Sequence, residues 1–257
     1  MQHRPEGRYW LAGGQKPVPH LTRAGIQFAL EHSRLLDLNL FYSEAKLERA
    51  LEKQRAGSNE LTKLLAELRQ HDGLLADVIL CRVVDNFLTF ISELLGLVYE
   101  VHPEMLRSSE QERIDFILQY ESMEELRKAI AEKRVDRLSY LGLRELADYV
   151  EKQMGFALFP AEDNLGQASI IVEYRNLLIH NRGVVSNVSA RRFPQLAADI
   201  GKRIGLPMEE VRDLRQFIEH SAIDIDVRAS EKFGLPIARL PRPPDSLMDS
   251  AIDRPET

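Results

Sequence analysis

Residues 78–95 read Val-Ile-Leu-Cys-Arg-Val-Val-Asp-Asn-Phe-Leu-Thr-Phe-Ile-Ser-Glu-Leu-Leu, and this stretch decides the expected fold. At helical spacing its apolar side chains cover almost every face. A helix that is apolar nearly all round is typical of the centre of a helical bundle. The wider apolar stretch from Leu74 to Val101 is broken by charged residues, among them Asp77, Arg82, Asp85 and Glu93. A bilayer span needs about 20 consecutive apolar residues, so we expect no membrane segment here.

The composition agrees with a helical globular protein. The chain has 257 residues, of which 44% are hydrophobic and 29% charged, with 14 glycines and 12 prolines to interrupt helices. This length holds one large domain, or one domain with extensions. No alternating pattern is long enough for a major sheet. The expected fold class is therefore all-α.

Breaks in the helical pattern divide the chain into four expected parts. Gly57-Ser58-Asn59 interrupts the apolar periodicity, and Asp72-Gly73 is a second candidate interruption. The parts are an irregular N-terminal arm (1–20), an N-terminal helical extension (21–59), a main helical domain (60–235) and a tail expected to be disordered (236–257).

Capping signals mark helix boundaries within the main domain. Ser109-x-x-Glu112 and Ser122-x-x-Glu125 have the form of capping boxes, each opening a helix. Gly155 is a good residue to end one. The pattern predicts helices over 138–154, from 163 or 164 to 183, over 193–204 and over 208–233, with a short extended piece over 184–188.

Charge is distributed unevenly along the chain. The formal net charge is −6, which argues against a general nucleic-acid coat protein. Between Tyr174 and Ala198, however, the sequence has four arginines and no Asp, Glu or Lys. The arginines are Arg175, Arg182, Arg191 and Arg192. They form a local patch suited to phosphates, or else they pair with acidic residues elsewhere, with Glu173 as an intramolecular candidate for Arg175.

The same segment carries the residues with the most chemistry. Residues 174–183 read Tyr-Arg-Asn-Leu-Leu-Ile-His-Asn-Arg-Gly. Each helical residue turns about 100°, so Arg175 and His180 lie about 140° apart, whereas Asn176 and His180 share a face. Histidine can exchange a proton with a ribose 2′-hydroxyl or a leaving oxygen near neutral pH, and arginine can bind a phosphate. Two such helices meeting across a twofold axis would enclose both residue types.

The run R-N-x-x-x-H-N, which continues into Arg-Gly-Val-Val, resembles the R-x4–6-H motif of the HEPN superfamily. The resemblance is sharp over residues 170–186 and diffuse over 60–235. It implies an all-α HEPN-like helical bundle, here with additional N- and C-terminal helices. It also implies a homodimeric, metal-independent endoribonuclease that needs no cofactor and acts on RNA.

The resemblance assigns catalytic roles to Arg175, Asn176 and His180, with Arg182, Arg191 and Arg192 as RNA-binding residues. It implies a role as a toxin or anti-phage defence effector, with an antitoxin or sensor protein as a further partner. The alternative is a non-catalytic HEPN module for dimerisation or nucleotide binding.

Other candidate sites are weaker. His71-Asp72 has the form of half a metal site without its partner ligands, and Asp224-x-Asp226 is a minimal cation pattern. Ser43-x-x-Lys46 matches a serine acylase pattern only trivially. The single cysteine, Cys81, excludes an intramolecular disulfide and a Cys-based zinc site. With no apolar signal core after Met1, the expected location is the cytoplasm.

Overall fold

The central helix of the computed structural model is α2, Ser58–Val101, as its apolar density predicts. Its residues Val83, Val84, Phe87 and Ile91 are completely buried. The helix is continuous through Gly73, so the interruption considered at Asp72-Gly73 is absent. The structure describes residues 20–56, 58–107 and 111–238, and for residues 52–70 it describes the backbone alone.

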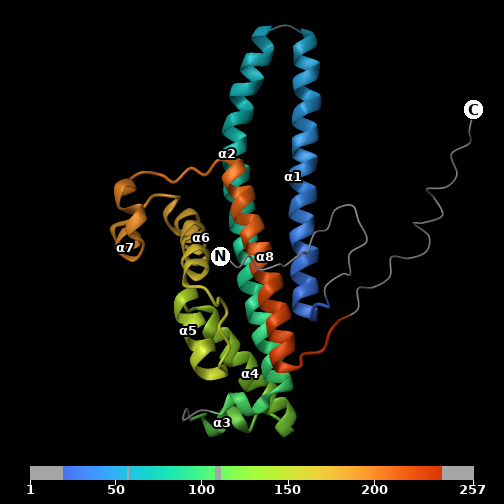
Figure 1. The fold of residues 1–257 in the computed structure, drawn as a ribbon, viewed down its shortest axis with the longest axis vertical. Coiled ribbons are helices and arrows are strands. Elements are labelled where there is room, and N and C mark those ends of the chain that lie inside the picture. The colour runs from blue at the N-terminus through green and yellow to red at the C-terminus, as the bar shows by residue number, and fades with distance from the viewer. Residues whose placement is uncertain (1–19, 57, 108–110, 239–257) are drawn as a thin grey trace, which may run out of the picture.

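Helix α1, Arg23–Ala56, runs antiparallel to α2 and forms a long hairpin with it. Figure 1 shows the hairpin projecting well beyond the other helices. The main core reaches only to Leu35 on α1 and Leu75 on α2 among the described side chains. Beyond these residues Asp72 accepts hydrogen bonds from Tyr42 (3.1 Å) and Lys46 (2.6 Å), which join the two helices.

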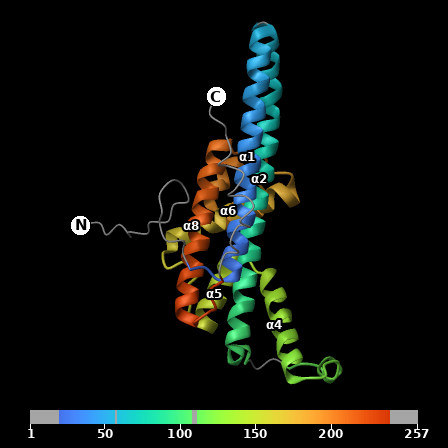
Figure 2. The ribbon, with the colours of Figure 1, turned by 90° about the vertical axis from the view of Figure 1, so that its right-hand side faces the viewer.

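Helix α8, Met208–Phe233, packs along both helices of the hairpin, and its predicted bounds are confirmed. In Figure 2 it lies on one side of the α1–α2 pair, and α4 lies on the other. Asp226 of α8 is fully buried and accepts hydrogen bonds from the backbone N (2.8 Å) and the hydroxyl (2.5 Å) of Thr22. This carboxylate therefore caps the start of α1, where the backbone N–H groups have no helical partners.

The middle of the chain forms four further helices: α3 (Ile114–Ile117), α4 (Met123–Ser139), α5 (Leu143–Met154) and α6 (Glu162–Asn181). The Ser122 hydroxyl accepts the Glu125 N–H at 3.1 Å, so Ser122 caps α4 as expected, while the Glu125 carboxylate accepts the N–H of Glu121 rather than that of Ser122. Gly155 ends α5 at φ +61°, also as expected. The predicted helix over 138–154 is wrong in one respect. Helix α4 ends at Ser139 and α5 begins at Leu143, so residues 138–154 do not form one continuous helix.

After α6 the chain forms α7 (Asn187–Arg192) and a 3-10 helix, η2 (Pro194–Asp199); another, η1, spans Pro103–Leu106. The helix expected over 193–204 is therefore wrong. Residues 200–204 instead pair with 183–185 through isolated bridges, Val184 with Arg203 and Val185 with Ile200. The extended piece expected over 184–188 is confirmed only at its start, because Ser186 already caps α7.

The described residues contain helices and isolated bridges but no β-strand, so the chain is all-α. No helix within 20–56, 58–107 and 111–238 combines the length and apolarity that crossing a bilayer requires. The Ser109 box, the N-terminal arm up to residue 19 and the tail from residue 239 lie outside the described residues.

Candidate functional site at the end of helix α6

The candidate site lies where α6 ends against α2. Helix α6 terminates with Arg182 at φ +53° and Gly183 at φ +79°. The Gly183 N–H donates to the Leu177 carbonyl at 2.7 Å, and the Asn181 side chain donates to the Val184 carbonyl. Within the described part of the chain, Arg182 is the only non-glycine residue at positive φ. A non-glycine residue in this conformation is less stable than glycine by of order 1 kcal/mol. The backbone turn alone would therefore favour glycine over Arg182.

Arg175 is held by an acidic residue of the central helix. Its Nε donates to Asp85 Oδ1 at 2.8 Å, and its Nη2 lies 2.6 Å from the same oxygen. Its Nη1 donates to Asn176 Oδ1 at 3.0 Å. The Arg175 side chain keeps 23% of its surface exposed, and that of Asp85 keeps 34%. The guanidinium is thus fixed in direction, while part of the Arg175 side chain still faces solvent.

Glu173 is not the partner of Arg175, so that interpretation is wrong. Glu173 is buried and lies 3.9 Å from the guanidinium of Arg192, at the end of α7. Residues two apart on a helix point to different sides, which is why the two side chains separate. Arg192 itself remains 64% exposed, and Arg191 and Arg182 are also exposed.

His180 lies in the last turn of α6 and is exposed. Its imidazole makes no hydrogen bond or ion pair with any residue in the described ranges. Asn176, although it shares a helical face with His180, directs its carbonyl oxygen to Arg175. One chain therefore brings Arg175 and Asn176 together and leaves His180 apart from them.

A second ion pair joins α2 to the segment that follows η2. Arg203, in the segment that pairs with Val184, binds Asp77 of α2 at 2.5 Å. A Cβ added to Gly183 would meet the side chain of Arg203 at 3.2 Å, so Gly183 lies level with Asp77. Arg175 is level with Asp85, eight residues further along α2. The later residues of α6 therefore lie beside the earlier residues of α2, so the two helices run antiparallel.

Both helices also carry an exposed apolar side chain in this part of the molecule. Ile179 is 47% exposed on α6, and Val78 is 52% exposed on α2. Cys81 lies half-buried beside the ion pair, and burial together with the Asp85 charge raises the pKa of its thiol. The end of α6 thus carries polar side chains together with one exposed apolar side chain, Ile179.

The weaker candidate sites have other partners in the structure. Asp72 binds Tyr42 and Lys46, Asp224 binds Arg228, and Asp226 binds Thr22. The Ser43 hydroxyl donates to the Asn39 carbonyl, so it is not paired with Lys46. No group of three or more metal-ligating side chains occurs in the parts of the chain that the structure describes.

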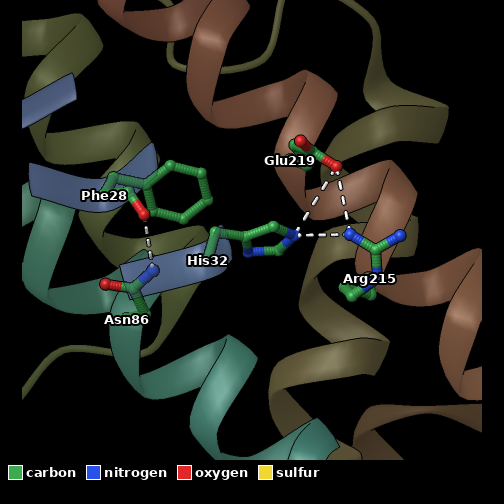
Figure 3. A network of polar contacts seen from close by, with 5 residues as sticks. All are labelled: Phe28, His32, Asn86, Arg215 and Glu219. Atoms are coloured by element: carbon green, nitrogen blue, oxygen red, sulfur yellow. Dashed lines mark hydrogen bonds and ion pairs between the residues drawn. The ribbon is translucent and has the colours of Figure 1, made fainter. Parts of the chain in front are cut away.

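Sequence reasoning did not identify a buried polar network that joins α1 to α8. Figure 3 shows His32 between Phe28 and the pair Arg215–Glu219. Arg215 Nη1 donates to His32 Nε2 at 2.9 Å, while His32 Nδ1 is buried with no partner among the residues that the structure describes. Burial, with the charge of Arg215, lowers the pKa of His32 to about 4, so this histidine is neutral at physiological pH.

A hollow of about 660 Å³ lies between α2 and α4, and Arg23, Glu100 and Arg127 are among its lining residues. Its charges are mixed, and its α2 residues, Gly96 to Glu100, come after those that contact the candidate site.

Comparisons with protein-family models, with curated proteins and with solved structures found no match. The likeness to HEPN proteins therefore rests on the motif of α6 itself.

Proposed function

We propose that this protein is a metal-independent endoribonuclease of HEPN type that acts as a homodimer. The observation that carries the proposal is the end of α6. There Arg175 is fixed and partly exposed, and His180 is exposed without a partner among the described residues. A phosphate-binding cation and a group able to exchange protons thus lie within two helical turns.

The proposed chemistry uses these groups without a metal. His180 takes the proton from a ribose 2′-hydroxyl, whose oxygen forms a bond to phosphorus while the bond from phosphorus to the 5′-oxygen breaks. The leaving 5′-oxygen takes a proton from solvent water, which yields a 2′,3′-cyclic phosphate and a 5′-hydroxyl, and His180 then releases its proton to solvent. Arg175 stabilises the charge that builds on the phosphate oxygens, the role that a metal ion would otherwise have.

The geometry of the helix supports the proposed dimer. Arg175 and His180 lie about 140° apart around α6, so one chain does not direct both at one phosphate. A twofold contact that covers Ile179 and Val78 would bury exposed apolar surface and bring His180 of one chain toward Arg175 of the other. Each site would then contain residues from both chains.

The local charge supports an RNA substrate. Arg182, Arg191 and Arg192 are exposed around the end of α6, in the segment without Asp, Glu or Lys between Tyr174 and Ala198. We assign them to backbone phosphates, so cleavage should slow as salt rises. The HEPN resemblance further suggests a toxin or anti-phage effector that an antitoxin or sensor protein controls.

The alternative is a non-catalytic dimerisation or nucleotide-binding module. The ion pair of Arg175 with Asp85 favours it, because a guanidinium bound to a carboxylate can simply join two helices. In that case the pair adds stability and His180 is an ordinary surface residue.

Incubation of the purified protein with total RNA in excess EDTA separates these functions. The proposal expects cleavage by wild type and at least a 100-fold slower rate for His180→Ala. Equal cleavage by both proteins, or cleavage only after magnesium is added, would overturn it.

A further inference from the structure

We infer that Asp85 is a positioning residue, which fixes Arg175 so that its remaining N–H groups face a phosphate. The inference rests on the proposed ribonuclease function and names the residue on which its arginine depends. Asp85 lies on the central helix α2, 90 positions before Arg175 in the sequence.

The hydrogen bonds of Arg175 leave part of its guanidinium available. A guanidinium has five N–H groups in a fixed plane. Asp85 takes one from Nε and one from Nη2, and Asn176 takes one from Nη1. One N–H on each of Nη1 and Nη2 thus has no partner among the described residues. Two such groups on neighbouring nitrogens match the spacing of two phosphate oxygens.

A free arginine side chain would not hold this direction. Its rotamer freedom is worth about 2 kcal/mol, and this must be lost again at each binding event if nothing fixes the group beforehand. Asp85 lies on a helix whose adjoining residues Val84 and Asn86 are both buried, so its own backbone is rigid. The pair therefore supplies the preorganised donor that transition-state stabilisation requires.

Charge and orientation predict opposite effects on binding and rate. The Asp85 carboxylate is an anion beside the proposed phosphate site, so its removal should leave RNA affinity equal or tighter. The same removal frees the guanidinium to move, and misplacement by about 1 Å can cost 100-fold in rate. If the carboxylate merely joined α2 to α6, its removal would not slow cleavage while leaving RNA affinity unchanged or tighter.

The structure offers a matched control on the same helix. Asp77 lies eight residues before Asp85 and binds Arg203 at 2.5 Å. Asp77→Asn removes the same charge from the same α2 surface but leaves the contacts of Arg175 intact. Asp85→Glu keeps the charge and moves the carboxylate by one methylene.

The test compares wild type, Asp85→Asn, Asp85→Glu and Asp77→Asn in three measurements. They are the single-turnover cleavage rate at saturating RNA, the affinity for an RNA with a 2′-deoxy cut site, and the NMR signal of Arg175 Nε–H. We expect Asp85→Asn to cut 10- to 100-fold more slowly, to bind within 3-fold of wild type or more tightly, and to lose the Nε–H signal.

Asp85→Glu should recover part of the rate, and Asp77→Asn should cut within 3-fold of wild type. If wild type cuts RNA and Asp85→Asn cuts as fast or faster, or loses rate only in proportion to affinity, the inference fails while the proposed function stands. If wild type cuts no RNA at all, the proposed function fails, and the positioning role fails with it.

Discussion

Single residues at the end of α6 differ in what they contribute to stability and to chemistry. His180 is exposed, whereas Arg175 forms an ion pair with Asp85 on α2. We expect His180→Ala to change the free energy of unfolding by less than about 0.5 kcal/mol. Arg175→Ala should lower it by about 1–2 kcal/mol, because Asp85 loses a charged donor. Urea unfolding of the two variants measures the difference.

Both variants should nevertheless lose RNA cleavage, by at least 100-fold each. Activity in Arg175→Ala that matches wild type, together with the expected loss of stability, would mean that Arg175 only joins two helices.

The buried histidine between α1 and α8 makes the free energy of unfolding depend on pH. His32 has a pKa of about 4 in the folded chain, below its usual 6.5, so the unfolded chain binds a proton more readily between these values. The stability that neutral His32 contributes is complete above pH 6.5 and falls as pH drops toward 4, by ~3 kcal/mol in all. Arg215 and Glu219 are the charged groups that face it.

His32→Gln removes this titration and keeps an acceptor for Arg215. The difference in unfolding free energy between wild type and variant should therefore shrink steadily from pH 7 to pH 4. Opposing titrations, such as that of Asp226, whose pKa is raised by burial, cancel in the difference. Two curves that stay parallel over this range would contradict the assignment.

At the scale of helices, replacing two glycines by alanine should have opposite effects on stability. A Cβ on Gly73 would meet nothing within 4 Å, so Gly73→Ala should stabilise α2 by about 0.5–1 kcal/mol. A Cβ on Gly25 would lie 2.6 Å from the Asp226 carboxylate, so Gly25→Ala should destabilise by about 1–3 kcal/mol. Thermal melts of the two variants should shift in opposite directions, and equal shifts would contradict the packing of α1 on α8.

Local signals predicted some helix boundaries and missed others. Ser122 and Gly155 were predictable because a cap or a positive φ depends on a few neighbouring residues. The interruption considered at Gly73 is absent because one glycine destabilises a helix by only about 1 kcal/mol, and packing against α1 outweighs this. The break between Ser139 and Leu143 was missed because apolar spacing continues across it.

The candidate site was predictable only in part for a similar reason. The sequence placed Arg175, Asn176 and His180 on one helix, and α6 contains all three. It did not predict Asp85 as the partner of Arg175, because that contact joins residues 90 positions apart. The one available signal was an acidic residue within the apolar stretch of the central helix.

At the scale of the whole molecule, the proposed site requires two chains. Wild type should have a mass of about 59 kDa in solution, twice the 29.4 kDa of one chain. Ile179→Glu should give a monomer that cleaves RNA slowly, because it places a charge in the proposed contact. Leu118→Glu is the control, since Leu118 is 77% exposed at the far end of the bundle. Light scattering that finds an active wild-type monomer at micromolar concentration would rule out a shared site.

The central claim is that the residues of α6 cut RNA through its 2′-hydroxyl without a metal. The most direct measurement uses one RNA and its copy with a single 2′-deoxy substitution at the cut site, each in excess EDTA. We expect the all-ribose RNA to be cut to a 2′,3′-cyclic phosphate and a 5′-hydroxyl, and the substituted RNA to stay intact at that site. Cleavage of the substituted RNA at an undiminished rate, or activity lost in EDTA and restored by magnesium, would contradict the roles given to Arg175 and His180.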